Sequence, residues 1–497
     1  MVHAAALLTR FRRVVTTTLI ALAAASPRLH AQAQSGSFTP TGSMITARSQ
    51  HTATLLPDGR VLVTGGVSQA GGYHTLSSAE LYDPATGLFT VAASMTTGRR
   101  MHEATLLPDG RVLITGGYGG ETSAGWGSPL ASAELYDPSS DRFTTTGNLI
   151  AATGGHSALL LASGRVLIVG GSGVGMFPDN VAPAQLYDPD MGTFTAAAAY
   201  AGRSECDFCA PAVLLADGTV LFLHQYPAQI YDPDTNAFRV TGRMIEDHTG
   251  STLLLNGKGL LAGGESDEYG RSAGAELYDP ATGTFSRTGA MTTGRVWHSL
   301  TLLPSGLVLA AGGETDSCTG TMCSFAGTVR SAEIYDPATG VFHAIGDMTA
   351  AHETHTATVL ADGRVLIAGG VVYGGIGPSY GSSTAEVYQP DELLPAPTIS
   401  GAIYHAGTSY VAGPEDPAAV GDTIDIQCKG LGSGSIVLPQ VSLGGRLARI
   451  VSVSDAPDLA GVKTVRVQVP PGVSGGRVGV RLTYLGRSSN TVTMAVK

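Results

Sequence analysis

Charge is scarce in this chain. Asp, Glu, Lys and Arg make up 14% of its 497 residues, against roughly a quarter in an average soluble domain. Only four residues are lysine, and the formal net charge is −11. A surface that binds nucleic acid or anionic lipid needs clustered Lys and Arg to neutralise phosphates. We therefore expect neither nucleic acid nor an anionic membrane surface among its partners.

Long apolar runs are also missing. The best candidate, Val14 to Ala25, is about 12 residues long and holds three threonines, whereas a bilayer span needs about 20 apolar residues. Three arginines precede this stretch and Ala31-Gln-Ala33 follows it, which is the pattern of an export signal. We predict that residues 1–33 are a signal peptide. The mature chain, without a transmembrane segment, is then expected in the periplasm, at the cell surface or outside the cell.

Glycine, by contrast, is abundant. The chain contains 67 glycines spread along its whole length, and each would cost about 1 kcal/mol inside a helix. This excludes a helical bundle or a coiled coil. The hydrophobic fraction of 43% is enough to bury a large core and excludes a disordered chain. We expect an all-β protein.

Three phrases recur in fixed order along the chain. An apolar run near a His ends in a turn, as in residues 51–59 (HTATLLPDG), and a second apolar run ends in a Gly pair. Ala-Glu-Leu-Tyr-Asp-Pro or a close relative follows. Its tyrosines span 306 residues in six steps, a mean period of 51. They are Tyr82, Tyr136, Tyr187, Tyr231, Tyr278, Tyr335 and Tyr388.

The repeats indicate a closed ring. After six of the tyrosines, an aromatic residue and a Met-like residue follow six positions apart, but this pair is missing after Tyr388. Phe38 and Met44 stand alone before the first repeat with the same spacing. Four short strands per repeat bury both faces only when repeats pack around an axis. A period near 50 with Gly pairs is typical of kelch repeats. We predict a seven-bladed kelch-type β-propeller over residues 36–392, closed by its N-terminal strand.

Strand direction predicts where function lies. The loops after the Gly pairs and the segments before each His fall at the same end of the propeller, and this end carries the irregular sequence. Both tryptophans, Trp126 and Trp297, lie there. Aromatic rings are suited to stacking on sugars or on an extended peptide, so we predict these two as ligand-binding residues.

Histidines form a second candidate set at this end. Five of them lie eight residues before the hairpin glycine of their repeats, and a sixth is displaced by one position. One interpretation is that each bonds a neighbouring blade; the other is a ligand or metal site around the axis. The candidates are His51, His102, His156, His298, His355 and the displaced His248.

Five cysteines are present, and export into an oxidising compartment makes them disulfide candidates first. Cys206 and Cys209 are predicted to form a local disulfide or a cap over the channel mouth rather than a redox centre. Cys318 and Cys323 are predicted to staple a long loop. Cys428 is left over, and no metal site is assigned.

The propeller resembles the kelch-type, galactose-oxidase-like family. Arg295-Val-Trp-His298-Ser, followed by a loop with Cys318 and Cys323, is similar to the copper-ligand blade of those oxidases, and Asp207-Phe-Cys209 resembles the segment whose Cys is cross-linked to a tyrosine. The resemblance implies a C-terminal immunoglobulin-like β-sandwich, expected over residues 396–497. Strand-like alternation supports it at Asp422–Cys428, Thr464–Val469, Arg477–Tyr484 and Asn490–Val496.

The copper set implied by the resemblance is incomplete. The family uses two tyrosines and two histidines, but His248 stands at one tyrosine position and Trp297 at the other. The sandwich segment from Leu443 to Ile450 contains no His. We therefore expect no cofactor, with copper or another cation as the alternative. We expect a chain that acts mainly as a binding module for a glycan or an exported protein. The competing hypothesis is a galactose-oxidase-like oxidoreductase or another carbohydrate-active enzyme.

Overall fold

The computed structural model describes residues 36–68, 74–120, 127–172, 182–200, 212–223, 227–266, 270–319, 322–373, 380–431, 437–457, 459–473 and 475–497. Residues 34–497 form one compact unit, and the predicted signal peptide, residues 1–33, lies outside the described residues. Every regular element in these ranges is a β-strand. Nowhere in the described part of the chain does a helix have the length and hydropathy to cross a bilayer.

Seven four-stranded antiparallel sheets form the blades, numbered I to VII along the chain. The innermost strands are β2 (Thr52–Leu55), β8 (Glu103–Leu106), β14 (Ser157–Leu160), β18 (Ala212–Leu214), β22 (Gly250–Leu253), β26 (Ser299–Leu302) and β32 (Thr356–Val359). The second strands are β3 (Val61–Thr64), β9 (Val112–Thr115), β15 (Val166–Val169), β19 (Val220–Phe222), β23 (Gly259–Ser266), β27 (Val308–Ala311) and β33 (Val365–Ala368).

The outer half of each blade is built from the tyrosine phrase and the strand after it. The third strands are β6 (Ala79–Asp83), β12 (Ala133–Asp137), β16 (Gln185–Asp188), β20 (Gln229–Asp232), β24 (Gly270–Asp279), β30 (Ala332–Asp336) and β36 (Ala385–Gln389). The outermost strands are β7 (Leu88–Ala92), β13 (Arg142–Thr145), β17 (Thr193–Ala196), β21 (Ala237–Val240), β25 (Thr284–Arg287), β31 (Val341–Ala344) and β1 (Ser37–Pro40).

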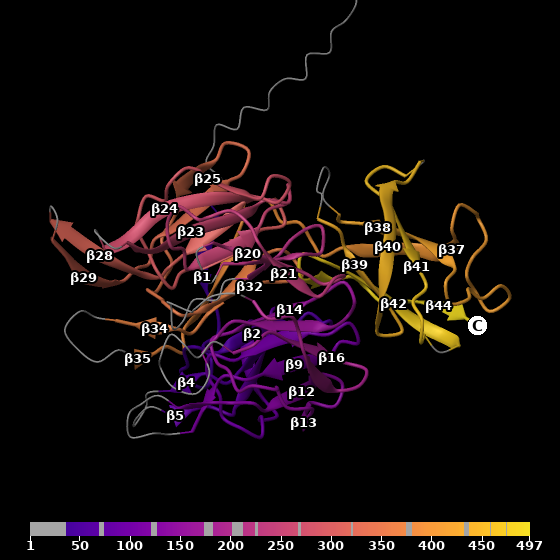
Figure 1. Ribbon diagram of the computed structural model, residues 1–497, viewed down its shortest axis with the longest axis horizontal. Coiled ribbons are helices and arrows are strands. Elements are labelled where there is room, and N and C mark those ends of the chain that lie inside the picture. Colours follow the sequence, from indigo (N-terminus) through magenta and orange to yellow (C-terminus); the bar gives the residue numbers. More distant parts are fainter. Residues whose placement is uncertain are drawn as a thin grey trace, which may run out of the picture. The chain divides into compact units, whose positions relative to one another are not determined.

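The blades close into a ring around one axis. Each innermost strand contacts the innermost strand of the next blade, and β32 of the last blade contacts β2 of the first. The second strands are apolar because blades cover them on both faces; Val61, Val112 and Val308, for example, have no exposed surface. The predicted seven-bladed propeller is confirmed (Figure 1).

The N-terminal strand completes the last blade, as predicted. β1 pairs with β36 in antiparallel register, with Phe38 opposite Tyr388 and their ring centroids 5.0 Å apart. The same Tyr–Phe contact recurs within the other blades, for example between Tyr82 and Phe89 at 4.8 Å. The displaced pair therefore belongs to blade VII, although more than 300 residues separate it from Tyr388 in the chain.

The propeller has two opposite ends. The hairpin face carries the turns between first and second strands, and the loop face carries the Gly pairs and the segments before each His. On the loop face, the residue two before the His pairs with the residue after the Gly pair, which confirms that both segments share this end. These bridges are Ser49↔Val67, Arg100↔Tyr118, Gly154↔Ser172, Val296↔Glu314 and Glu353↔Val371.

Four short strand pairs project from the loop face. They are β4 (Val67–Ser68) with β5 (His74–Thr75), β10 (Tyr118–Gly119) with β11 (Ser128–Pro129), β28 (Glu314–Thr319) with β29 (Met322–Thr328), and β34 (Val371–Val372) with β35 (Tyr380–Gly381). In blade V, the strands β23 and β24 themselves extend past the Gly pair. The blades thus differ mainly in what they carry at this end.

The C-terminal residues form one curled eight-stranded sheet. Its strands are β37 (Thr398–His405), β38 (Thr423–Lys429), β39 (Gln440–Leu443), β40 (Arg446–Asp455), β41 (Lys463–Gln468), β42 (Gly476–Tyr484), β43 (Arg487–Ser488) and β44 (Val492–Val496). The first part of β40 pairs with β39 and the rest with β41. Because β40 belongs to both halves, the sheet curls at this strand and its two halves enclose one core.

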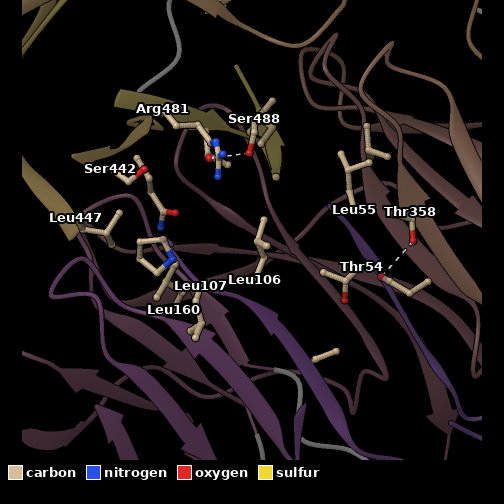
Figure 2. A pocket seen from close by; sticks show the side chains of 18 of the residues that line it. Thr54, Leu55, Leu106, Leu107, Leu160, Thr358, Ser442, Leu447, Arg481 and Ser488 are labelled. Carbon is tan, nitrogen blue, oxygen red and sulfur yellow. Dashed lines mark hydrogen bonds between the residues drawn. The ribbon is translucent and has the colours of Figure 1, made fainter. Parts of the chain in front are cut away.

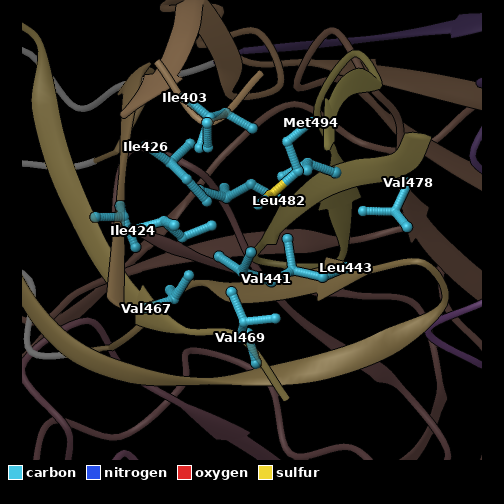
Figure 3. Close-up of a cluster of buried hydrophobic side chains, with 14 of the residues drawn as sticks. Ile403, Ile424, Ile426, Val441, Leu443, Val467, Val469, Val478, Leu482 and Met494 are labelled. Carbon is cyan, nitrogen blue, oxygen red and sulfur yellow. The ribbon is translucent and has the colours of Figure 1, made fainter. Parts of the chain in front are cut away.

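That core confirms the predicted immunoglobulin-like sandwich. Ile424 and Ile426 of β38 face Val441, Leu443 and other residues of the opposite strands, as Figure 3 shows. Inward residues alternate with outward ones along β42. Cys428, the leftover cysteine, is buried in this core as a free thiol.

Candidate binding site on the loop face

Unusual backbone conformations lie beside the propeller axis at the loop face in five consecutive blades, VI, VII, I, II and III. In five blades, the residue before the inner-strand His has positive φ, and four of these residues are not glycine. We call them the axial ring: Gln50 (φ 54°), Met101 (50°), Gly155 (68°), Trp297 (53°) and Thr354 (49°). Each such non-glycine residue costs about 1–3 kcal/mol, and strain of this kind concentrates at functional sites.

Backbone hydrogen bonds join the axial ring from blade to blade. Thr354 N donates to Trp297 O at 3.1 Å, and Gln50 N donates to Thr354 O at 3.5 Å. Met101 N donates to Gln50 O at 2.9 Å, and Gly155 N to Met101 O at 2.8 Å. The ring thus fixes the position of each member, including Trp297, against its neighbours.

The predicted histidines belong mostly to the wall between blades. The Nε2 atom of His102 lies 3.1 Å from the Oγ1 atoms of both Thr52 and Thr64 in the preceding blade. His51, His156 and His355 contact one hydroxyl each in the same way. Burial lowers the pKa of these last three to about 3, so they are neutral near pH 7. The bonds reach side-chain hydroxyls of the neighbouring blade, and His51 also contacts the backbone of Ala368 there.

His298 is the exception among them. Both of its ring nitrogens are buried without a hydrogen-bond partner. The preceding blade has Gly250 and Ala262 paired where blade I has Thr52 paired with Thr64, so both hydroxyls are missing. Burial lowers the pKa of His298 to about 3.

His248 has a different role from the one its sequence position indicates. Its Nδ1 atom lies 3.0 Å from Gly263 O and its Nε2 atom 3.0 Å from Glu276 Oε1. In blade VI, Arg295 makes the equivalent contacts with Gly312 O and Glu333. His248 therefore replaces an arginine that clamps two segments of a blade, and it does not extend the histidine set.

A polar cluster lies beside Trp297, across blades V to VII. Arg271 of β24 donates to the carboxylate of Glu314, and its Nη1 atom lies 2.9 Å from Glu265. The Arg271 backbone N–H donates to Asp316 at 3.1 Å. Its guanidinium also lies over the Trp297 ring, 5.8 Å from the centroid, within reach of a cation–π contact. We call this group, with Glu353, the loop-face cluster.

Glu353 completes the loop-face cluster with an unusual carboxyl group. The residue is 8% exposed, and its Oε2 atom is buried without a partner. Burial raises the pKa of Glu353 to about 8, and the neighbouring Glu314 carboxyl adds to this effect. The raised pKa favours the protonated form of Glu353 near pH 7. A protonated carboxyl can donate a hydrogen bond, whereas an ionised carboxylate only accepts.

The sequence pattern predicts part of this cluster. Trp297 is a predicted ligand-binding residue, and the structure leaves it 37% exposed. Arg271 and Glu353 are not predicted because they lie in different blades, Arg271 at the start of β24 and Glu353 in the segment before an inner strand. The one available signal for Glu353 is its place two residues before an inner-strand His, a position where acidic residues do not recur.

Several predicted residues fall wholly or partly outside the described structure. Trp126, Cys206 and Cys209 lie outside the described residues, so their roles stay predictions. Cys318 and Cys323 are direct partners across the β28–β29 pair. Opposite residues of antiparallel strands have Cα atoms about 4.5–5.5 Å apart, which falls within the range that disulfides span. Their side chains are not described, so the disulfide stays a prediction as well.

Copper, which the family resemblance implies, does not fit the residues present. The indole of Trp297 offers no lone pair where the family has a phenolate. Both nitrogens of His248 are engaged by Gly263 and Glu276. His298 has free nitrogens, but among the described residues no group of three or more His, Cys, Asp or Glu is placed to hold a metal ion. The described residues therefore do not reproduce the copper site of that family.

Comparison with known proteins supports the fold alone. No family model matches the chain, and no curated protein matches its sequence. Among solved structures, it is similar to a fungal alcohol oxidase of the AA5 family in complex with copper, with a TM-score of 0.60 at 20% identity. The match covers 93% of this chain and 99% of that one. The chain therefore has the galactose-oxidase-like fold, a seven-bladed kelch-type propeller followed by an immunoglobulin-like sandwich.

Proposed function

We propose that the chain is an exported binding module that holds a glycan, or in the second place an exported protein, on its loop face. The proposal rests mainly on the exposure and the fixed position of Trp297. Its indole is 37% exposed, its backbone is fixed by the axial ring, and Arg271 lies against its ring. A rigid, flat apolar surface next to hydrogen-bonding groups is suited to stacking on the C–H face of a sugar.

The charges around Trp297 favour a neutral or basic ligand. Four carboxyl groups surround one guanidinium, those of Glu265, Glu314, Asp316 and Glu353 around Arg271. Ionised carboxylates accept hydrogen bonds from sugar hydroxyls, and that of Glu265 is the exposed one in this cluster. A polyanion would be repelled by the same group. Export itself rests on the signal-peptide pattern in residues 1–33.

A glycan array followed by titration of the best ligand tests this proposal. Trp297→Ala should lower the affinity by about tenfold or more, which corresponds to about 1.4 kcal/mol, while the melting temperature stays within a degree or two. Tyr410→Ala, which removes a 70% exposed aromatic ring on the sandwich, is the matched control and should change nothing. The proposal fails if binding persists in the Trp126→Ala, Trp297→Ala double variant and is abolished by deleting residues 396–497.

One observation favours a second candidate, a carbohydrate-active enzyme. A protonated carboxyl beside another carboxyl is the arrangement that glycosidases use, one group as acid and the other as base or nucleophile. Here Glu353 is the carboxyl with the raised pKa, and Glu314 is the carboxyl beside it. Incubating the protein with the glycan that it binds and measuring released reducing ends decides between the two. Hydrolysis that disappears in Glu353→Gln would establish the enzyme.

A further inference from the structure

A cavity lies at the hairpin face, the end of the propeller opposite the loop-face cluster, against the sandwich. Its volume is about 400 Å³, within the range of small-molecule sites. The hairpin ends of four blades form one wall, with Leu106, Leu107 and Leu160, and the sandwich strands form the other, with Ser442 and Arg481. Figure 2 shows these two sets facing each other across the space. This cavity is separate from the loop-face cluster.

The lining of this cavity carries a positive charge and no negative one. Among the described residues that line it, Arg481 is the one with a charged side chain, and none is Asp or Glu. Its Nε atom is buried without a partner, and its Nη2 atom makes one long bond, of 3.4 Å, to Thr491 Oγ1. A guanidinium in this state retains unused hydrogen-bond donors, and an anion can satisfy them.

The carboxylate that attracts Arg481 does not neutralise it. That carboxylate belongs to Asp109, but the Asp109 Oδ2 atom already lies 2.7 Å from both Nε and Nη2 of Arg111. Two arginines therefore share one carboxylate. Desolvation still lowers the pKa of Arg481 in spite of Asp109. The chain as a whole carries a net charge of −11, so a half-buried cation that shares its counterion is a local exception.

The rest of the lining defines what else a ligand would meet. Gln440, Ser442, Thr483 and Ser488 supply amide and hydroxyl groups on the sandwich side, whereas the propeller side is mostly leucine and alanine. A ligand with one charged end and one apolar end would match both sides. A single guanidinium suits one carboxylate better than a doubly charged phosphate, which would keep an unpaired charge out of water.

We propose that this cavity binds a small amphiphilic monocarboxylate, with its carboxylate on Arg481 and its hydrocarbon part along the leucines of the hairpin face. The site is independent of the loop-face proposal. Octanoate is a suitable probe, and octan-1-ol is its neutral counterpart with the same chain length.

Calorimetric titration of octanoate into the full chain tests the proposal. Saturable binding is expected, with octan-1-ol bound about tenfold more weakly or not at all, as expected for loss of a hydrogen bond to a charged group. Arg481→Gln should weaken octanoate binding by about tenfold or more. Arg477→Gln is the matched control, because Arg477 lies on the same strand and donates to Thr493 but does not line the cavity.

Further arms separate binding at this cavity from binding elsewhere on the chain. Trp297→Ala should leave octanoate binding unchanged, which excludes the loop face. If Arg481→Gln fails to fold, Arg481→Lys keeps a cation and should retain measurable binding, and octanoate but not octan-1-ol should raise the melting temperature of the unmodified chain. Equal binding of acid and alcohol, unchanged binding in Arg481→Gln, or no saturable binding would each overturn the proposal.

Discussion

His298 keeps the histidine found at this position in other blades, but the hydroxyl groups that would bond it are missing. Its counterpart His102 reaches two threonine hydroxyls, but Gly250 and Ala262 leave His298 with none. A buried polar group without a partner costs about 1–3 kcal/mol. The unpartnered His298 therefore lowers the free energy of unfolding, and one added hydroxyl group should recover part of this loss.

Ala262→Thr should stabilise the protein by about 1 kcal/mol, the typical net value of one hydrogen bond. The new hydroxyl would reach His298 as Thr64 reaches His102. Ala311→Thr is the control, because the histidine that faces it, His355, already contacts Ser299. Chemical denaturation measures both, and equal effects in the two variants would show that the unpartnered nitrogens of His298 are not the cause.

The Glu353 carboxyl should make stability depend on pH. Its pKa rises from 4.5 to about 8 on folding, so between these values the folded chain binds more protons than the unfolded one. By linkage, the free energy of unfolding then falls as pH rises through this window and levels off above it. Burial raises the pKa of Glu103 to about 8 as well, and it contributes in the same direction.

Glu353→Gln should therefore flatten this fall without abolishing it, because Glu103 remains. The gain over the unmodified chain should be largest above the folded pKa of about 8, where the native Glu353 is ionised beside Glu314. Glu265→Gln, at an exposed position of the same cluster, serves as the control. Unfolding titrations at several pH values give the slopes, and an unchanged slope in Glu353→Gln would contradict the proton assignment.

The short strand β1 closes the propeller. It is four residues long, but it supplies the outermost strand of blade VII and places Phe38 on Tyr388. Met44, which follows it, is 3% exposed. Without this segment, β36 would present an open edge, and such edges promote aggregation.

Deleting residues 35–45 should lower the melting temperature by far more than an ordinary terminal trim and should produce soluble aggregates. Removing residues 1–34 alone is the control and should leave the folded core intact. Differential scanning calorimetry with light scattering measures both effects. A truncated chain that melts within a degree or two of the control would show that closure does not depend on β1.

The element pattern was predictable because it is repeated. Seven copies of the tyrosine phrase average out local ambiguity, and the displaced Phe38–Met44 pair revealed how the ring closes. Single residues were harder to place. His248 is one position off its phrase, and only the structure shows that its ring takes the contacts of an arginine. Arg271 and Glu353 meet because blades V and VII approach the same axis, which no local pattern records.

In the whole molecule, the propeller and the sandwich together form a cavity. Neither the repeat pattern nor the strand alternation predicts it. The sandwich residue Arg446 pairs with Asp190 of the propeller, and Gly445 lies against Asp109. The cavity around Arg481 exists because these surfaces meet. The residues that line it come from distant parts of the chain, from Ala53 in the first blade to Ser488 near the end of the sandwich.

The five bridges beside the axial ring have a consequence for how such a protein can change. Each fixes the residue after a Gly pair, where a loop begins. In four blades the end of that loop is fixed as well, because a backbone N–H there donates to the second glycine of the pair: Leu76 to Gly66, Leu130 to Gly117, Val329 to Gly313 and Ser382 to Gly370. A segment of any length can be exchanged between those points without moving the blades. The loop face therefore behaves as a set of interchangeable inserts on a constant frame, and new specificity can arise there one blade at a time.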